Sequence, residues 1–173
     1  MYAFSLKLSV VLSLLSVLSA AQTTAPLTFR QITANAGYIF SGTVAAVERV
    51  PATRPNEVDT MRITFHVDQG VKGAHSRQSL TIREWGGLWN AGEKYQVGER
   101  VVLMLYPPSK LGLTSPVAGS LGRFVVDGTG RLTLPPQQAE TLAADPVVGP
   151  WLQGRTRTSG REFARILRRV AKE

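Results

Sequence analysis

One stretch of the chain, from Arg83 to Tyr106, constrains the fold more strongly than any other. It reads REWGGLWNAGEKYQVGERVVLMLY, so a polar strand end meets the glycine pair Gly86-Gly87, and an apolar run, VVLML, follows a turn. An unbroken apolar run between turn signals is typical of a central strand that is covered on both faces. We therefore predict a sheet whose central strand begins at Arg100. The glycine pair should mark a point where the backbone has positive φ or a very close neighbour.

Further strands follow from the spacing of apolar residues. Residues 59 to 71 alternate between apolar and polar positions, which indicates a half-buried antiparallel strand. Its apolar face comprises Met61, Ile63, Phe65 and Val67. Residues 38 to 50 predict a long strand with a bulge or sharp bend at Gly42. The other strands are expected at residues 78–85, 121–126 and 131–134, and the last two are joined by a tight turn.

Helices are expected at both ends of this strand-rich region. Residues 27 to 36 predict a short helix that stops at Gly37, and residues 88 to 97 are read as a loop. Residues 135 to 158 are read as a linker that contains one or two helical turns. Residues 159 to 173 predict an amphipathic helix, because Ser159 and Glu162 form a capping box. Its apolar stripe is Phe163, Ile166, Leu167 and Val170, and its basic residues include Arg161, Arg165, Arg168 and Arg169.

The fold class is therefore mainly β. We expect a small five- to six-stranded barrel of the oligonucleotide/oligosaccharide-binding (OB) type over residues 22–134, with a short N-terminal helix and a C-terminal amphipathic helix. A β-sandwich is the alternative. A chain of this size can bury one core without metals or disulfides, and it contains no cysteine.

The first 21 residues have the pattern of a secretory signal peptide. Lys7 supplies a positive start, residues 8 to 18 are apolar with interspersed serines, and Ser19-Ala20-Ala21 is a small-residue cleavage site before Gln22. The alternative is an uncleaved anchor, but the apolar run is shorter than the roughly 20 residues that span a bilayer. We expect a secreted or periplasmic protein, and the absence of cysteine favours a bacterial one.

The net charge of +8 is concentrated near the end of the chain. Residues 155 to 173 carry seven Arg or Lys against two Glu, whereas residues 22 to 154 carry twelve basic and ten acidic residues. The basic character therefore belongs to the tail, and nucleic acid is not the expected partner.

Three successive segments resemble one known family. LTFRQITANAGYIFSGTVAAVE, TMRITFHVDQGVKG and YQVGERVVLMLYP, with WGG between the last two, look like uncharacterised secreted bacterial proteins related to netrin modules and tissue inhibitors of metalloproteinases. The resemblance covers about residues 27 to 134 and implies a five-stranded OB-like barrel whose loops and ends bind something. In the inhibitors an N-terminal cysteine binds the protease zinc. This chain has no cysteine, so zinc binding by Gln22 is not implied.

Few residues suggest catalysis, a metal or a cofactor. His66 and His75 have no carboxylate at ligand spacing, and surface positions explain them better than a metal site does. Asp68, His75 and Ser76 could be written as a triad, but only geometry identifies one. Glu84, Glu93 and Glu99 surround the glycine pair and could serve a small hydrolase, although ordinary solvated or ion-paired carboxylates explain them better. We expect no cofactor and no enzyme activity.

The aromatic residues beside the glycine pair are the strongest candidates for binding. Trp85, Trp89 and Tyr95 could contact a ligand with Gly86 and Gly87 permitting close approach, or at least one of them could plug the end of the sheet. The tail helix packs on the sheet, or its arginines contact an anionic membrane or polyanion. The leading hypothesis is an exported, non-enzymatic module that binds a protein or peptide through the region 83–95. The sequence leaves the partner and the oligomeric state open.

Overall fold

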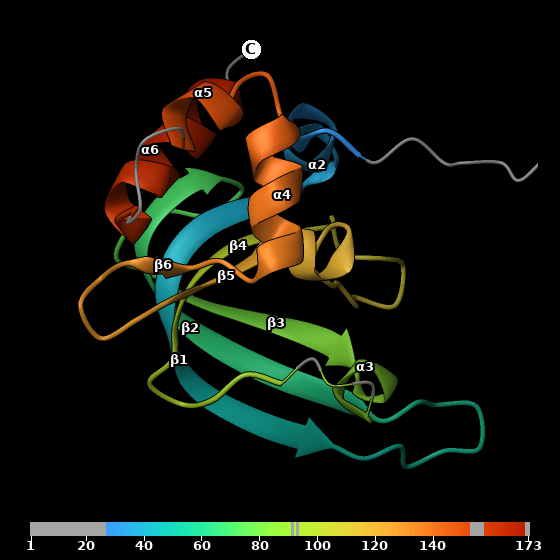
Figure 1. Cartoon of the computed structure of the whole chain (residues 1–173). Helices are drawn as coiled ribbons and strands as arrows, with labels where there is room; N and C mark the ends of the chain where they lie inside the picture. The colour runs from blue at the N-terminus through green and yellow to red at the C-terminus, as the bar shows by residue number, and fades with distance from the viewer. Residues whose placement is uncertain (1–26, 91, 93, 153–157, 172–173) are drawn as a thin grey trace, which may run out of the picture.

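The structure, a computed structural model, describes residues 27–90, 92, 94–152 and 158–171, and it is built on one antiparallel sheet (Figure 1). The predicted signal peptide, residues 1–21, lies outside the described residues. The sheet contains six strands in the order β3-β2-β1-β4-β5-β6. The strands are β1 (Tyr38–Val50), β2 (Thr60–Lys72), β3 (Ser79–Trp85), β4 (Arg100–Leu105), β5 (Arg123–Val126) and β6 (Leu132–Thr133).

The mainly β prediction is confirmed, and the sheet is open. All six strands belong to one sheet, whereas the sandwich alternative requires two packed sheets. β3 and β6 are its edges. Near the β3 edge, the amide of Thr114 donates a hydrogen bond of 2.8 Å to the carbonyl of Arg83, so the loop after β4 approaches the first edge strand without extending the sheet.

β1 carries the bulge that the sequence predicted. The strand bends strongly along its length (Figure 1), and its register with β2 shifts between Ser41 and Gly42. Gly42 has no space for a side chain, because a Cβ there would lie 2.5 Å from the carbonyl oxygen of His66. The small residue therefore permits the close approach of β1 and β2 where the sheet curves.

β4 is covered on both faces, as its apolar run predicts. Five of its six residues are buried, from Val101 to Leu105. Val102 and Met104 face a core that the helices complete. Alternate residues face a second core formed with β1, β2 and β3, which includes Val101, Leu103, Leu105, Phe40, Phe65 and Ile82.

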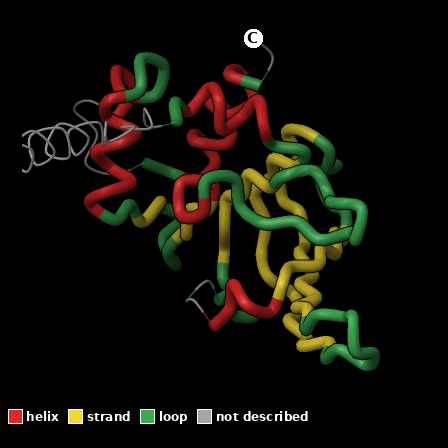
Figure 2. Tube along the Cα trace, turned by 90° about the vertical axis from the view of Figure 1, so that its right-hand side faces the viewer, coloured by secondary structure: helices red, strands yellow, loops and turns green. Residues whose placement is uncertain are grey.

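The helices gather at one end of the sheet, and one short helix lies at the other end (Figure 2). Their bounds are α2 (Phe29–Asn35), α3 (Gly86–Asn90), α4 (Pro136–Ala144), α5 (Gly149–Leu152) and α6 (Gly160–Val170), with a 3-10 turn η1 (Gly119–Gly122). α2 begins at a capping box in which the Thr28 hydroxyl accepts from Gln31 N. The short helix at the opposite end is α3. Its last residues, 88–90, belong to the segment 88–97 that was predicted as a loop, so that prediction was wrong at its start.

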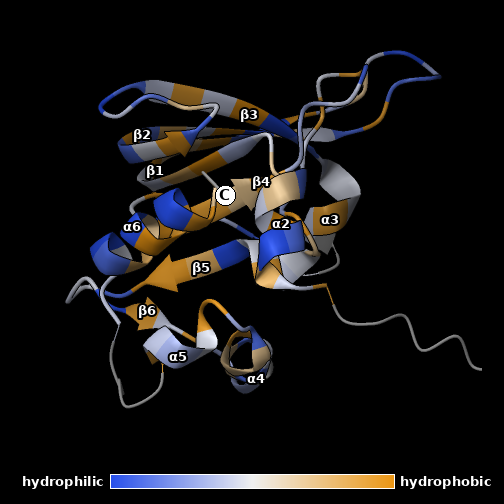
Figure 3. Ribbon diagram, turned by 90° about the horizontal axis from the view of Figure 1, so that it is seen from above, coloured by the Kyte–Doolittle hydropathy of each residue, from blue (hydrophilic) through white to orange (hydrophobic). Residues whose placement is uncertain are grey.

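The C-terminal helix packs on the sheet. α6 contacts β1, β2 and β4, and its buried residues include Phe163, Leu167 and Val170. The Phe163 ring lies 4.7 Å from the ring of Phe124 on β5. Figure 3 shows β5 as hydrophobic along most of its length and α6 as a mixture of both kinds of residue. The Ser159 hydroxyl accepts from Glu162 N at 3.1 Å, which confirms the predicted helix start.

The segment that was predicted as a linker, residues 135 to 158, contains two helices and contributes residues to the core. α4 and α5 occupy this segment, and Leu142 and Val148 are buried in the same core as α6. The Asp145 carboxylate accepts a hydrogen bond of 2.7 Å from the amide of Phe29 at the start of α2. The segment therefore ties the two ends of the described chain to one core.

Replacing Gly42 by Ala should destabilise the protein. The new Cβ would overlap the carbonyl oxygen of His66, and overpacking of this kind costs about 1–3 kcal/mol. Gly128→Ala is a matched control, because a Cβ there would meet no atom within 4 Å. Urea unfolding of both variants would measure the difference, and equal stabilities would contradict the packing argument.

Candidate functional site

The predicted tryptophan and glycine residues surround one cavity at the α3 end of the sheet. We call it the tryptophan cavity; its volume is about 400 Å³. It is lined by Arg49, Asp59, Met61, Trp85, Gly86, Gly87, Trp89 and Lys94. The structure thus brings together four of the five residues that the sequence analysis nominated, and it adds residues from the β1–β2 hairpin.

Trp85 is the exposed member of this group. Side chains alternate along β3, so the buried Ile82 and Glu84 lie on alternate positions and Trp85 takes the opposite face at the strand end. Trp85 is 51% exposed, which is unusual for so large an apolar side chain. About half of its side chain is therefore accessible to solvent at the end of β3.

The two glycines permit close packing and do not supply positive φ. Neither is among the residues with positive φ. A Cβ at Gly87 would lie 2.4 Å from the indole ring of Trp85, and a Cβ at Gly86 would lie 2.9 Å from the carbonyl oxygen of Asp59. The amide of Gly86 also donates to that carbonyl at 2.7 Å. The backbone turn into α3 thus lies directly against the Trp85 ring and the β1–β2 hairpin.

Tyr95 lies beneath the cavity and does not line it. It is 4% exposed, and its hydroxyl donates to Glu84 Oε1 at 3.2 Å. Its ring lies 5.6 Å from Phe65 and 6.1 Å from the half-buried Trp89. Tyr95 is therefore part of the core that supports Trp89, which is the plug role that the sequence analysis left open for at least one of the three aromatic residues.

Of the carboxylates considered for a hydrolase, the two that the structure describes are either buried or ion-paired. Glu84 is fully buried. Glu99 forms an ion pair of 2.9 Å with Arg123, whose guanidinium also stacks 4.4 Å from the Tyr95 ring centroid. Neither Glu84 nor Glu99 lines the tryptophan cavity, and Glu93 lies outside the described residues. The described carboxylates therefore do not assemble an acid/base pair there.

The charged rim of the cavity is the part that sequence reasoning missed. The Asp59 carboxylate accepts from the amide of Ala52 at 2.8 Å and from the Arg49 guanidinium. These two hydrogen bonds lower the pKa of Asp59, with the Ala52 bond contributing most. Lys94 adds a second positive charge. The sequence did contain a signal for this rim. Arg49 and Asp59 lie at the ends of two predicted strands, and these ends meet when β1 pairs with β2.

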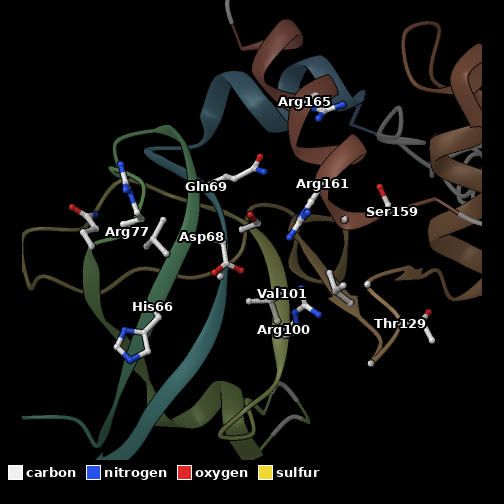
Figure 4. A pocket seen from close by; sticks show the side chains of 18 residues that line it. His66, Asp68, Gln69, Arg77, Arg100, Val101, Thr129, Ser159, Arg161 and Arg165 are labelled. Carbon is white, nitrogen blue, oxygen red and sulfur yellow. The ribbon is translucent and has the colours of Figure 1, made fainter.

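The basic tail residues separate into two groups. Arg161 and Arg165 line a second cavity of about 840 Å³, which we call the arginine cleft (Figure 4). Arg168 donates to the carbonyl of Gly70 at 3.3 Å, and Arg169 is exposed outside the cleft. The tail was expected to act as one basic helix, but folding divides its arginines between different surroundings.

The histidines do not assemble a metal site. His66 and His75 are exposed, and the described part of the chain contains no group of three or more His, Asp or Glu side chains able to hold an ion. The Ser76 hydroxyl accepts from the amide of Gly70 at 3.0 Å, which gives this serine a role in the turn after β2. His66 lines the arginine cleft.

The acid side of the stability profile should depend on Asp59. Its folded-state pKa is lowered, so it contributes stability above its unfolded pKa of about 3.9 and loses that contribution as pH falls through the folded value. The stability difference between wild type and Asp59→Asn should therefore shrink as pH falls below about 4. Urea unfolding of both proteins across this range would measure it, and a constant difference would contradict the assignment.

Comparison with known proteins does not assign a family. No protein-family model matches the chain, and no curated protein or solved structure matches it either. Within the described residues, no helix has the length and apolar character that crossing a bilayer requires. A functional proposal therefore depends on the cavities and side chains of this chain.

Proposed function

We infer that the protein is an exported, non-enzymatic binding module that recognises a protein or peptide partner through the tryptophan cavity. The observation that carries this proposal is Trp85, which is half exposed, lines a cavity and has Gly87 directly against its ring. Tryptophan and arginine are enriched among the residues that dominate binding energy at protein interfaces. Trp85 and Arg49 line the same cavity, so the site combines both residue types.

The chemistry of the rim favours a peptide over a purely apolar ligand. Arg49 and Lys94 are positive, Asp59 is negative, and Met61 and Trp89 supply an apolar floor. A cavity of about 400 Å³ is at the lower end of the range for ligand pockets, so it suits one or two inserted side chains of a longer partner. The charged rim can then hydrogen-bond the polar groups that flank them.

We further propose that the open sheet is a partly open OB-type barrel of the kind found in netrin modules and metalloproteinase inhibitors. Three observations support this proposal: the strong bend at Gly42, the short helix α3 between β3 and β4, and the hydrogen bond from Thr114 to Arg83 near the free edge. Protease inhibition is not part of the proposal, because the inhibitors use a cysteine that this chain lacks. Export is supported by the signal-like pattern of residues 1–21.

The hydrolase alternative gains no support from the described residues, because Glu84 is buried and Glu99 is paired with Arg123. Membrane attachment through the apolar stripe of α6 is also disfavoured. Phe163, Leu167 and Val170 are already buried against the sheet and its neighbouring helices.

Trp85→Ala should weaken partner binding strongly and leave the fold intact. Peptides selected from a display library against the purified protein would be synthesised and titrated by intrinsic tryptophan fluorescence and calorimetry. Loss of a half-exposed interface tryptophan typically costs about 2 kcal/mol or more, which is at least about a thirtyfold loss of affinity. Thermal denaturation should change little, since Trp85 is not part of either core.

Leu111→Ala is the matched control, because Leu111 is 71% exposed and does not line the cavity. Its affinity for the selected peptides should equal that of wild type. Trp89→Ala should instead lower stability, because Trp89 packs against the core that contains Tyr95. Peptides that bind Trp85→Ala as tightly as wild type would refute the site.

A further inference from the structure

The arginine cleft lies between the sheet and α6, away from the tryptophan cavity, and shares no lining residue with it. Six segments meet there: β1, β2, the turn before β3, the start of β4, the β5–β6 turn, and the N-terminal half of α6. Its volume of about 840 Å³ is within the range of ligand pockets. Its charged residues are Arg77, Arg100, Arg161, Arg165 and Asp68.

The four arginines of the cleft are not neutralised by neighbouring carboxylates. Four other arginines of the described chain form ion pairs: Arg49, Arg54, Arg62 and Arg123. None of the cleft arginines pairs with a carboxylate in the part of the chain that the structure describes, and all four are exposed. Asp68 is the single acidic residue among the described residues of the lining, which therefore have an excess of three positive charges. Concentrating like charges in a concavity raises the local positive potential.

The backbone holds one of these arginines in an uncommon conformation. Arg77 has a φ of 64°, in the left-handed region that glycine adopts more easily. Its amide donates to the carbonyl of Val67 at 2.7 Å, which fixes the turn beside the cleft. Strained non-glycine residues of this kind are concentrated at binding sites. A glycine would suit the turn better, so the arginine side chain is the feature that needs a function.

We propose that the arginine cleft binds a ligand that carries two or more phosphate groups. Figure 4 shows Arg161 extending from α6 toward the sheet, on the side of Arg100. A phosphate presents several acceptor oxygens in a tetrahedral arrangement, so guanidinium groups from α6 and from β4 can bond the same group from different sides. A single arginine can already hydrogen-bond both oxygens of a carboxylate in a bidentate pair. The excess of three positive charges therefore matches a multiply charged phosphate better than a single carboxylate.

The other lining residues narrow the ligand class. Among the described residues that line the cleft, the imidazole of His66 is the only aromatic side chain, so they do not form the stacking platform that single-stranded nucleic acids use. Ser41, Gln69, Thr129 and Ser159 add hydrogen-bonding groups that suit phosphate oxygens or hydroxyl groups. Both a free phosphate oligomer and a phosphorylated headgroup have this chemistry. The proposal does not depend on the tryptophan cavity, and failure at one site leaves the other testable.

Calorimetric titration of the purified protein with inorganic tripolyphosphate would test the proposal. The double variant Arg161→Gln/Arg165→Gln should bind at least tenfold more weakly. The matched control is Arg30→Gln/Arg169→Gln, which removes the same charge from exposed positions outside the cleft and should change affinity less than twofold. Asp68→Asn should bind several times more tightly, because it removes the one negative charge that faces the ligand.

Arg77→Gly separates a ligand contact from a structural role. It should keep or raise the melting temperature, since glycine suits the positive φ, and it should still weaken tripolyphosphate binding. Vesicles that contain cardiolipin, a lipid whose headgroup carries two phosphate groups, form a second arm. Binding to vesicles alone, lost in the cleft double variant, would assign the phosphate to a lipid headgroup, whereas binding to tripolyphosphate would assign it to a soluble ligand.

Three results would overturn the proposal. One is equal weakening of binding by the cleft variant and the control variant, which would indicate a general charge effect. Another is citrate binding as tightly as tripolyphosphate, which would remove the preference for phosphate. The third is the absence of binding to both tripolyphosphate and the vesicles at low salt, where phosphate contacts are strongest.

Discussion

The burial of β4 on both faces is the constraint on which the rest of the structure depends. An isolated apolar strand cannot satisfy its backbone or cover its side chains, so VVLML requires a paired strand on each side and a packed layer on each face. β1 and β5 provide the pairing. The curved continuation of the sheet covers one face, and α2, α4 and α6 contribute to the core on the other. Because α2, α4, α5 and α6 gather at one end of the sheet and only the short helix α3 lies at the other, the two ends of the molecule acquire different surfaces.

Each candidate site follows from this division. At the end without the large helices, α3 packs against the second core through Trp89. Trp85, just before α3, remains half exposed. At the other end, α6 lies over β1, β2 and β4, and its N-terminal half forms one wall of the arginine cleft. The same packing that buries Phe163 and Leu167 therefore directs Arg161 and Arg165 toward a concavity. A peptide site and a phosphate site on one small domain would allow it to join two different ligands.

The strands were predictable because their signals are local. Alternation of apolar residues located β2 and β3, the apolar run located β4, and the glycine inside a branched segment located the bulge in β1. α3 was missed, since GGLWN has neither the length nor the capping residues from which a helix is recognised. The core role of Leu142 and Val148 was also missed, because a Pro- and Gly-containing segment resembles a linker until its apolar residues find a surface.

Side-chain roles within the sites divide in the same way. The sequence by itself determined that Trp85, Gly86, Gly87 and Trp89 would lie together, because they are adjacent along the chain and follow a strand. Only the tertiary structure separated exposed Trp85 from buried Tyr95, and only it brought Arg77 and Arg100 to the arginines of α6. The physical reason is distance along the chain: local patterns specify which face of a strand or helix a side chain takes, whereas its neighbours across a cleft depend on how whole elements pack.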